Sequence, residues 1–491
     1  MPKKTPKFKQ LFIGDTLQSK ISKGIAWSFL GTFLSKGLML LSFILIARII
    51  TVEEYGQVGV IRNTIATFAA FSVMSFGVTA TKYLAIYKDT DSIRAERILT
   101  FTRGTVFIIS VLISIIIFVF SDFIASTMLD DISLSFEVEI SSFTIFFTAL
   151  NGYQNGLLAG LEKFKEISFI NIFNGILTFP ILIIMAYLYQ VNGIVIGLVI
   201  ISLSTWIISD YYIRLSMKKN SLKYRFDSFY KELEIIKNFT LPSFLSGLSI
   251  TPAILMTNLI LAHQDNGYYH LGVFNAAYFF SIITSTINGI IGQVLYPYAM
   301  KQYNKDNKRF EYFNIISPWI IGIILNLPLI ILPEVMVIFF GSQYDNEDFR
   351  VSVVMVALFS IIIAHRQGIA RNFAAANLMW WSVFGNAIWG IFLILFTYIF
   401  ASYGSIGLAI AFLTAYAFNS IIFLPLYLKW GLVKRELLIS YPVLIIWLLL
   451  LFSSIIYFFI ENTFFRVSFL IVILLSINYL FLILWRSYHV K

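Results

Sequence analysis

Basic side chains lie inside several long apolar stretches of the sequence, where an ionisable group is costly. Acidic residues that could pair with them at the same depth are nearly absent, since Glu137, Asp210 and Glu334 fall toward the ends of their stretches. An excess of cations inside apolar segments indicates a water-filled, electropositive cavity that binds an anion. Guanidinium groups match phosphate geometry well, so the pattern favours a phosphate-bearing ligand. The cations concerned are Lys36, Arg48, Arg62, Arg366 and Arg371.

These cations differ in how strongly their positions indicate binding. Lys36 falls near the middle of its stretch, too far from either end for its side chain to reach the surface easily. We expect Lys36, Arg62 and Arg366 to line the cavity, whereas Arg371 fits a structural pair as well as it fits a cavity. Arg48 ends its stretch and is typical of an interfacial anchor.

Other polar side chains in the same stretches have a weaker claim to binding. Amides can hydrogen-bond sugar hydroxyls, but inside a membrane they more commonly join neighbouring helices. His365 is more typical of a hydrogen-bonded core histidine than of a proton carrier. The weaker candidates are Arg48, Lys82, His365, Asn174 and Asn386, and the remaining amides are Asn151, Gln154, Asn155, Asn288 and Gln293.

The elements that must carry these residues are transmembrane helices. Of the 491 residues, 58% are hydrophobic and 13% charged, and the mean hydropathy of +0.82 is far above that of a soluble protein. Apolar stretches of about 20 residues, long enough to span a bilayer, recur between residues 24 and 486. The pattern predicts an all-α integral membrane protein with about fourteen spans.

Basic residues alternate between the loops in a way that indicates an orientation. Even-numbered connections carry Lys and Arg, most densely in residues 218–237, whereas odd-numbered connections are nearly free of them. By the positive-inside rule, both termini are expected in the cytoplasm.

A repeated pattern divides the chain into two similar halves. Residues 55–60 open the second span as residues 268–273 open the eighth, and residues 192–198 are echoed by residues 403–408. Both pairs are spaced by roughly 210 residues, which predicts two six-helix lobes related by a parallel repeat around a central cavity. The expected divisions are an N-terminal segment 1–23, an N-lobe 24–217, a cytoplasmic linker 218–238, a C-lobe 239–430, and two further helices with a tail in 431–491.

Several chemistries are excluded by what the sequence lacks. There are no cysteines, which excludes disulfides, thiolate metal sites and a cysteine nucleophile. There is no Walker A, HExxH or GxSxG motif, and no long outer loop to form a hydrolase or glycosyl-transfer site. The net charge of +10 is spread over short loops, which argues against nucleic acid as a partner. We expect a transporter with no catalytic residue, metal or cofactor, and coupling to H⁺ or Na⁺ stays open.

One run of residues resembles a known family. It comprises GIAW at residues 24–27, ARIITVEEYG at 47–56, FGV at 76–78 and the pair Lys82 and Tyr83. This run resembles the multidrug/oligosaccharidyl-lipid/polysaccharide (MOP) exporter superfamily, within it the polysaccharide transporter branch that includes the O-antigen (Wzx-type) flippases. Where that family often has Gly-Pro before the acidic pair, this chain has Thr51 and Val52.

The resemblance implies an alternating-access flippase in a prokaryotic plasma (inner) membrane. Its cargo would be an undecaprenyl-diphosphate-linked oligosaccharide, moved from the cytoplasmic to the outer leaflet for O-antigen or surface polysaccharide assembly. The family's cation-lined cavity is matched by position and charge at Lys36, Arg62 and Arg366. Implied partners are the lipid-linked glycan, the bilayer, a polysaccharide polymerase and glycosyltransferases. Three alternatives remain: a flippase for the peptidoglycan lipid precursor, a drug or cation antiporter, and a membrane glycan polymerase or ligase.

Overall fold

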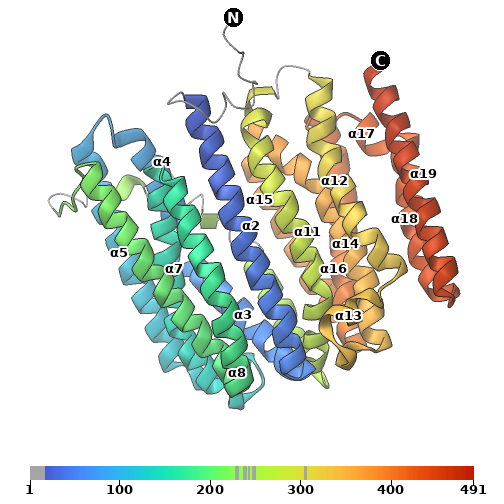
Figure 1. The fold of residues 1–491 in the computed structure, drawn as a ribbon, viewed down its shortest axis with the longest axis horizontal. Helices are drawn as coiled ribbons and strands as arrows, with labels where there is room; N and C mark the ends of the chain where they lie inside the picture. The colour runs from blue at the N-terminus through green and yellow to red at the C-terminus, as the bar shows by residue number, and fades with distance from the viewer. Residues whose placement is uncertain are drawn as a thin grey trace, which may run out of the picture. The chain divides into compact units, whose positions relative to one another are not determined.

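The chain folds into α-helices throughout the part that the structure describes (Figure 1). A computed structural model describes residues 17–73, 75–226, 232–235, 240–241, 244–245, 250–302, 307–376 and 378–490. Within those ranges there is no β-strand, and the only irregular elements are short turns and single-turn helices. The prediction of an all-α membrane protein is confirmed.

Ten helices in the described ranges are long and apolar enough to cross a membrane, or eleven if a pair bent by 41° counts as one span. Two of these elements, Phe164–Lys219 and Trp380–Lys429, have 56 and 50 residues. At about 1.5 Å per residue, each is long enough to cross a bilayer core of about 30 Å twice. The number of crossings is therefore larger than the number of continuous elements, in keeping with the sequence pattern.

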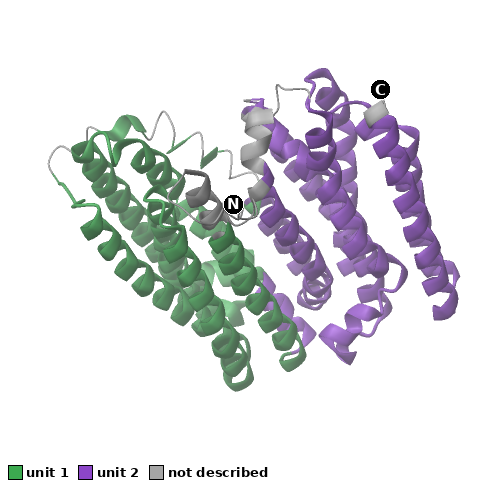
Figure 2. Ribbon diagram, turned by 45° about the horizontal axis from the view of Figure 1, so that its top comes forward, with its two compact units in different colours: residues 1–50, 60–251 green, residues 51–59, 252–491 purple. Residues whose placement is uncertain are grey.

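Two compact units make up the chain (Figure 2). Unit 1 comprises residues 1–50 and 60–251, and unit 2 comprises residues 51–59 and 252–491. The helices that begin in residues 17–219 are α2 (Leu17–Ile49), α3 (Val52–Val73), α4 (Phe76–Tyr87), α5 (Ser92–Val119), α6 (Ser121–Phe123), η1 (Ile124–Met128), η2 (Ile132–Leu134), α7 (Ser135–Gly160) and α8 (Phe164–Lys219).

Unit 2 carries the later helices and the first residues of α3. Its helices are α10 (Thr251–Ala262), α11 (Gly267–Gln302), α12 (Lys308–Ile331), α13 (Val335–Phe340), η5 (Ser342–Tyr344), α14 (Glu347–Ala375), α15 (Met379–Phe400), η6 (Ala401–Tyr403), α16 (Gly404–Lys429), α17 (Glu436–Ile439), α18 (Tyr441–Phe459) and α19 (Thr463–Val490).

Apolar side chains fill the interior of each unit and also cover its outside. In unit 1, Phe76, Leu99 and Leu157 belong to one buried cluster, and in unit 2 Trp319 and Phe412 are fully buried. The last two helices expose large apolar side chains as well: Leu448 is 64% exposed, Phe459 82% and Leu475 64%. An apolar surface of this extent would aggregate in water, so lipid is its natural surrounding.

The two sequence echoes at residues 192–198 and 403–408 adopt the same local packing. α8 turns at Gln190, where the backbone leaves helical geometry, and this turn divides the helix into two arms. A Cβ atom at Gly193, in the second arm, would overlap the Met185 carbonyl oxygen of the first arm. Likewise, a Cβ atom at Gly407 would overlap the Phe400 carbonyl oxygen at the end of α15. In both places glycine lets two antiparallel helices approach at the turn, so the repeat seen in the sequence is a repeat of structure.

The other pair of echoed glycines forms a close helix crossing inside unit 2. A Cβ atom at Gly56 would overlap the Tyr268 carbonyl oxygen, and one at Gly272 would overlap the Val52 carbonyl oxygen. The starts of α3 and α11 therefore touch backbone to backbone. Because a backbone atom cannot move aside as a flexible side chain can, neither position has room for a methyl group.

We expect Gly272→Ala to destabilise the protein by about 1–3 kcal/mol, because the added methyl group must push the two helices apart. The matched control is Gly289→Ala in the same helix, where a Cβ atom would meet nothing within 4 Å. Thermal unfolding of both purified variants in detergent measures the difference. Equal unfolding temperatures for the two variants would contradict the close crossing.

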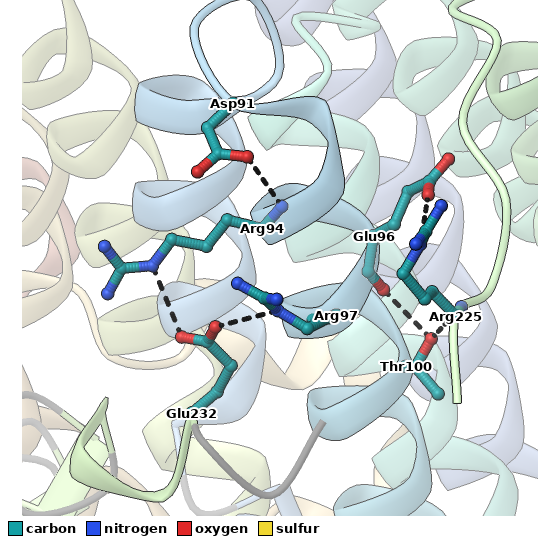
Figure 3. A network of polar contacts seen from close by, with 7 residues as sticks. All are labelled: Asp91, Arg94, Glu96, Arg97, Thr100, Arg225 and Glu232. Atoms are coloured by element: carbon teal, nitrogen blue, oxygen red, sulfur yellow. Dashed lines mark hydrogen bonds and ion pairs between the residues drawn. The ribbon is translucent and has the colours of Figure 1, made fainter. Parts of the chain in front are cut away.

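The first part of the expected linker, up to residue 226, is held against α5 by Glu96 (Figure 3). Glu96 accepts a hydrogen bond from the Lys223 backbone N–H at 2.9 Å and pairs with the Arg225 guanidinium at 3.1 Å. Buried Glu232 lies 3.4 Å from Arg94 and 3.5 Å from Arg97. The sequence marks this segment only as basic, whereas the structure shows two carboxylates neutralising part of that charge. Residues 227–231 and 236–238 of the expected linker, like residues 1–16, lie outside the described residues.

Candidate functional site

Lys36 projects from a face of α2 that does not pack inside unit 1. The opposite side of α2 meets α8, where the Ser168 hydroxyl donates to the Trp27 carbonyl oxygen at 2.7 Å. Lys36 is exposed, as are Phe29 and Phe33, which lie at helical spacing on the same face. Among the described residues, Lys36 has no hydrogen-bond or ion-pair partner. A cation on such a face must meet either lipid or water, and the cost of a charge in hydrocarbon favours water or an anion.

Arg62 is positioned by an aromatic ring. It is half-buried on α3, and its Cζ atom lies 3.8 Å from the centroid of the Phe43 ring on α2. A guanidinium stacked in this way is held in place by its flat face. Lys36 and Arg62 thus give unit 1 two cations within apolar helices.

Arg366 lines a cavity in unit 2. The cavity has a volume of about 250 Å³ and lies between α14, α16 and the segment that includes α17 and α18, with Tyr427 and Trp447 among its mostly apolar lining residues. Arg366 is half-buried, and its guanidinium has no hydrogen bond or ion pair with any residue that the structure describes. The side chain is therefore available to an anionic ligand.

Arg371 lies one to two turns further along α14, in a different environment. It is buried, and its guanidinium donates to the Asn314 side-chain oxygen at 2.6 Å and to the Asn314 carbonyl oxygen at 2.8 Å. Asn314 also donates to Asn372, which in turn donates to the Leu432 carbonyl oxygen at 2.6 Å. Together these hydrogen bonds connect α12, α14 and the segment before α17. This is the structural arrangement that the sequence left open for Arg371.

The weaker candidates are spread over both units. His365 is buried between Trp319 and Trp447, with ring centroids 4.4 and 5.8 Å away, and its Nε2 atom has no hydrogen-bond partner among the described residues. Arg48 is exposed in the last turn of α2. The exposed Lys82 lies over the Tyr83 ring, and Asn386 is half-buried on α15.

Most of the amides join helices. Asn174 donates to the Thr205 hydroxyl at 2.7 Å, Asn151 to the Ser202 carbonyl oxygen at 3.0 Å, and Asn288 to the Pro318 carbonyl oxygen at 3.3 Å. Gln154 likewise donates to the Trp206 carbonyl oxygen. Asn155 is an exception, with no hydrogen-bond partner among the described residues, and the Gln293 side chain lies outside them.

The candidate residues are charged and polar groups on apolar helices. In the described part of the chain, no three His, Cys, Asp or Glu side chains gather as metal ligands would. Lys36 and Arg366 are cations on apolar helices with no hydrogen-bond or ion-pair partner among the described residues. Cations in such positions favour a ligand that combines an anionic group with an apolar part.

The family model for polysaccharide biosynthesis proteins matches residues 21–303, more than half of the chain. The chain belongs to the family of polysaccharide biosynthesis proteins. The matched region includes Lys36, Arg62 and the described helices of unit 1 from residue 21 onward. No curated protein matches the chain.

Solved structures with the same fold are transporters of the MOP superfamily. An inward-facing MATE multidrug transporter is similar with a TM-score of 0.67 at 14% identity, covering 86% of this chain and 96% of that one. The lipid II flippase MurJ, in an inward closed conformation, has a TM-score of 0.67 at 18% identity, covering 93% and 98%. A MOP transporter from Pyrococcus furiosus, described as having a binding pocket of reverse polarity, has a TM-score of 0.61 at 17% identity, covering 87% and 99%.

The family match confirms the predicted polysaccharide branch, and the chain shares its fold with MATE transporters and MurJ. The protein is a multi-pass membrane protein with this fold. At these levels of identity the structural matches establish the fold alone, so the cargo must be argued from the residues.

Proposed function

We propose that this protein flips an undecaprenyl-diphosphate-linked oligosaccharide from the cytoplasmic to the outer leaflet by alternating access, for O-antigen or other surface polysaccharide assembly. The observation that carries the proposal is the pair of cations Lys36 and Arg366. Each belongs to an apolar helix, and each has no acidic partner among the described residues. Membership of the polysaccharide biosynthesis family supports a glycan as part of the cargo.

A diphosphate satisfies the chemistry of these residues. Lys36 in unit 1 and Arg366 in unit 2 are each a candidate for contacting it. Contacts between an ionised donor and a phosphate oxygen are shorter and stronger than neutral hydrogen bonds. The polyprenyl chain remains in lipid, where the exposed apolar side chains of both units provide a compatible surface. We assign Arg371 to positioning, because Asn314 holds its guanidinium.

Three alternatives are separated by what they require. An antiporter for cationic drugs needs an anionic site, and Lys36 and Arg366 repel a cation. A glycan polymerase or ligase needs a reactive centre, and the residues above supply binding groups only. A flippase for the peptidoglycan lipid precursor uses the same lipid diphosphate anchor, and the similarity to MurJ keeps it as the second candidate.

Complementation in bacteria distinguishes the two flippase functions. The gene is expressed in one strain that lacks its O-antigen flippase and in another depleted of its peptidoglycan precursor flippase. We expect surface polysaccharide to return in the first strain and no rescue of growth in the second. Rescue of growth alone would overturn the choice of cargo. Co-purification of a polysaccharide polymerase or a glycosyltransferase from the first strain tests the proposed partners.

We further propose an inner-membrane location with both termini in the cytoplasm. Because the chain has no cysteines, single cysteines report orientation without removing any native residue. A cysteine at Asp89, in the exposed turn between α4 and α5, is expected to resist an impermeant thiol reagent added to intact spheroplasts. A cysteine at the exposed Asp265, between α10 and α11, is expected to react. The reverse labelling pattern would contradict this orientation.

A further inference from the structure

An open cavity with several polar lining residues lies in unit 1 between α7 and both arms of α8. Its volume is about 250 Å³, and asparagine, threonine and serine side chains supply its polar lining. At about 30 Å³ per molecule in liquid water, this is the volume of about eight water molecules, roughly the space of one sugar ring. No lining residue that the structure describes is charged. The cavity is therefore unsuited to a phosphate and suited to a neutral hydroxylated group.

Several hydrogen-bonding groups at this cavity are unused. The side chains of Asn155 on α7 and Asn171 on α8 make no hydrogen bond to any described residue. The Oδ1 atom of Asn151 is buried without a partner, while the Nδ2 group of the same side chain is fixed by the Ser202 carbonyl oxygen. Buried polar atoms are normally paired, so the buried, unpaired Oδ1 atom of Asn151 indicates a missing ligand or water, and the exposed Asn155 and half-buried Asn171 can bond the same group.

The chemistry of the lining matches a sugar. A carboxamide can donate to one hydroxyl and accept from the next, as vicinal sugar hydroxyls require. Leu158, Ile167 and Ile170 also line the cavity and can cover the apolar face of a sugar ring. The polar residues and the apolar residues both belong to α7 and α8, whose packing fixes their positions.

The cavity is close in sequence and structure to the cation-bearing helix. Ile167 lines the cavity, and the next residue, Ser168, bonds α8 to the Trp27 carbonyl oxygen of α2. α8 thus contacts, through adjacent residues, both the neutral cavity and the helix that carries Lys36. Lys36 itself lies on the face of α2 that points away from α8, so a sugar in the cavity is bound apart from a phosphate at Lys36.

We infer that the cavity between α7 and the two arms of α8 is a subsite for an uncharged sugar unit, which hydrogen-bonds to Asn151, Asn155 and Asn171. This inference rests on the proposed function, since it assigns the glycan part of the same cargo. It adds a selectivity element: lipid diphosphates that carry a neutral, hydroxyl-rich sugar bind more tightly than the bare lipid diphosphate.

Two probes measured on the same protein test this subsite. They are undecaprenyl diphosphate alone and undecaprenyl diphosphate bearing a single N-acetylhexosamine, with affinities determined for the full-length protein in detergent. The wild-type protein is expected to prefer the sugar-bearing lipid. The double variant Asn155→Ala, Asn171→Ala is expected to lose about tenfold of that preference, the effect of two hydrogen bonds, while its affinity for the bare lipid is unchanged. Asn192→Ala, an exposed asparagine on the same helix but outside the cavity, is the matched control.

The ratio of the two affinities remains informative if the double variant is partly unfolded, because both probes then lose the same fraction of sites. The single variants Asn155→Ala and Asn171→Ala provide a second measurement, each with a smaller loss expected. An unchanged ratio in the double variant, or equal affinities in the wild type, overturns the subsite and leaves the proposed function standing. Failure of the wild type to bind either lipid overturns the proposed function and the subsite with it.

Discussion

Replacing Lys36 by alanine is expected to lower surface polysaccharide about tenfold or more, while the amount of protein in the membrane stays unchanged. The loss follows because a charge-assisted contact to a phosphate contributes about 1.5–3 kcal/mol, and each 1.4 kcal/mol is about a factor of ten. Stability is spared because Lys36 is exposed and has no bonded partner among the described residues. Quantitative staining of surface glycan in a complemented flippase-deficient strain, alongside immunoblotting of membranes, measures both effects.

Two variants provide the controls for this result. Lys36→Arg preserves the charge and is expected to retain most of the activity. Lys219→Ala removes an exposed lysine at the end of α8 and is expected to leave export unchanged. Full surface polysaccharide with Lys36→Ala at normal protein levels would show that Lys36 does not bind the cargo.

Two arginines of α14 are expected to give opposite results when each is replaced. Arg371→Leu should destabilise the protein by about 2–4 kcal/mol, because it leaves both Asn314 oxygens inside the unit without their charged donor. Arg366→Ala should change stability by no more than about 0.5 kcal/mol. It should nevertheless reduce export as strongly as Lys36→Ala does, since its guanidinium has no partner among the described residues and faces a cavity.

Thermal unfolding in detergent and surface glycan staining separate the two roles. Glycine at position 292 provides a further control for Arg371, because a Cβ atom there would come within 3.1 Å of the guanidinium. Gly292→Ala should therefore weaken the same cluster mildly. If Arg371→Leu unfolds at the wild-type temperature, or if Arg366→Ala unfolds several degrees lower, the two assignments are wrong.

The helical fold could be read from the sequence because a membrane imposes a simple rule. Every backbone group in lipid must be bonded within the chain, so each apolar stretch of sufficient length is a helix. The internal repeat was equally accessible, because glycine at positions 56, 193, 272 and 407 is required where backbones approach. The echo at residues 192–198 also marked the tight turn inside α8, where the backbone leaves helical geometry at Gln190.

The candidate site was only partly predictable. Hydropathy places a cation at a depth in the membrane but does not say which face of the helix it occupies. Arg366 and Arg371 differ by little more than one turn, yet Asn314 on another helix satisfies only Arg371. The sequence named Asn155 as one of several amides able to bond sugar hydroxyls but did not name Asn171, and it could not separate Asn155 from amides that join helices, as Asn174 does. Only tertiary packing shows which amides are left over.

The charge balance near the linker shows the same limit. Arg94, Arg97 and Arg225 read from the sequence as topological markers, and they do not reveal their partners. Glu96 pairs with Arg225, 129 residues away in the sequence, and Glu232 lies 138 residues from its partner Arg94. The sequence pattern alone does not indicate pairs so far apart.

The central claim is tested most directly by transfer between leaflets in a purified system. The protein is reconstituted into liposomes that contain an undecaprenyl-diphosphate-linked oligosaccharide with a fluorescent sugar, and an impermeant quencher reports the leaflet that each glycan occupies. We expect transfer well above that of protein-free liposomes, slowed about tenfold or more by Lys36→Ala. Transfer no faster than in protein-free liposomes, or joining of glycans without transfer, would contradict the account.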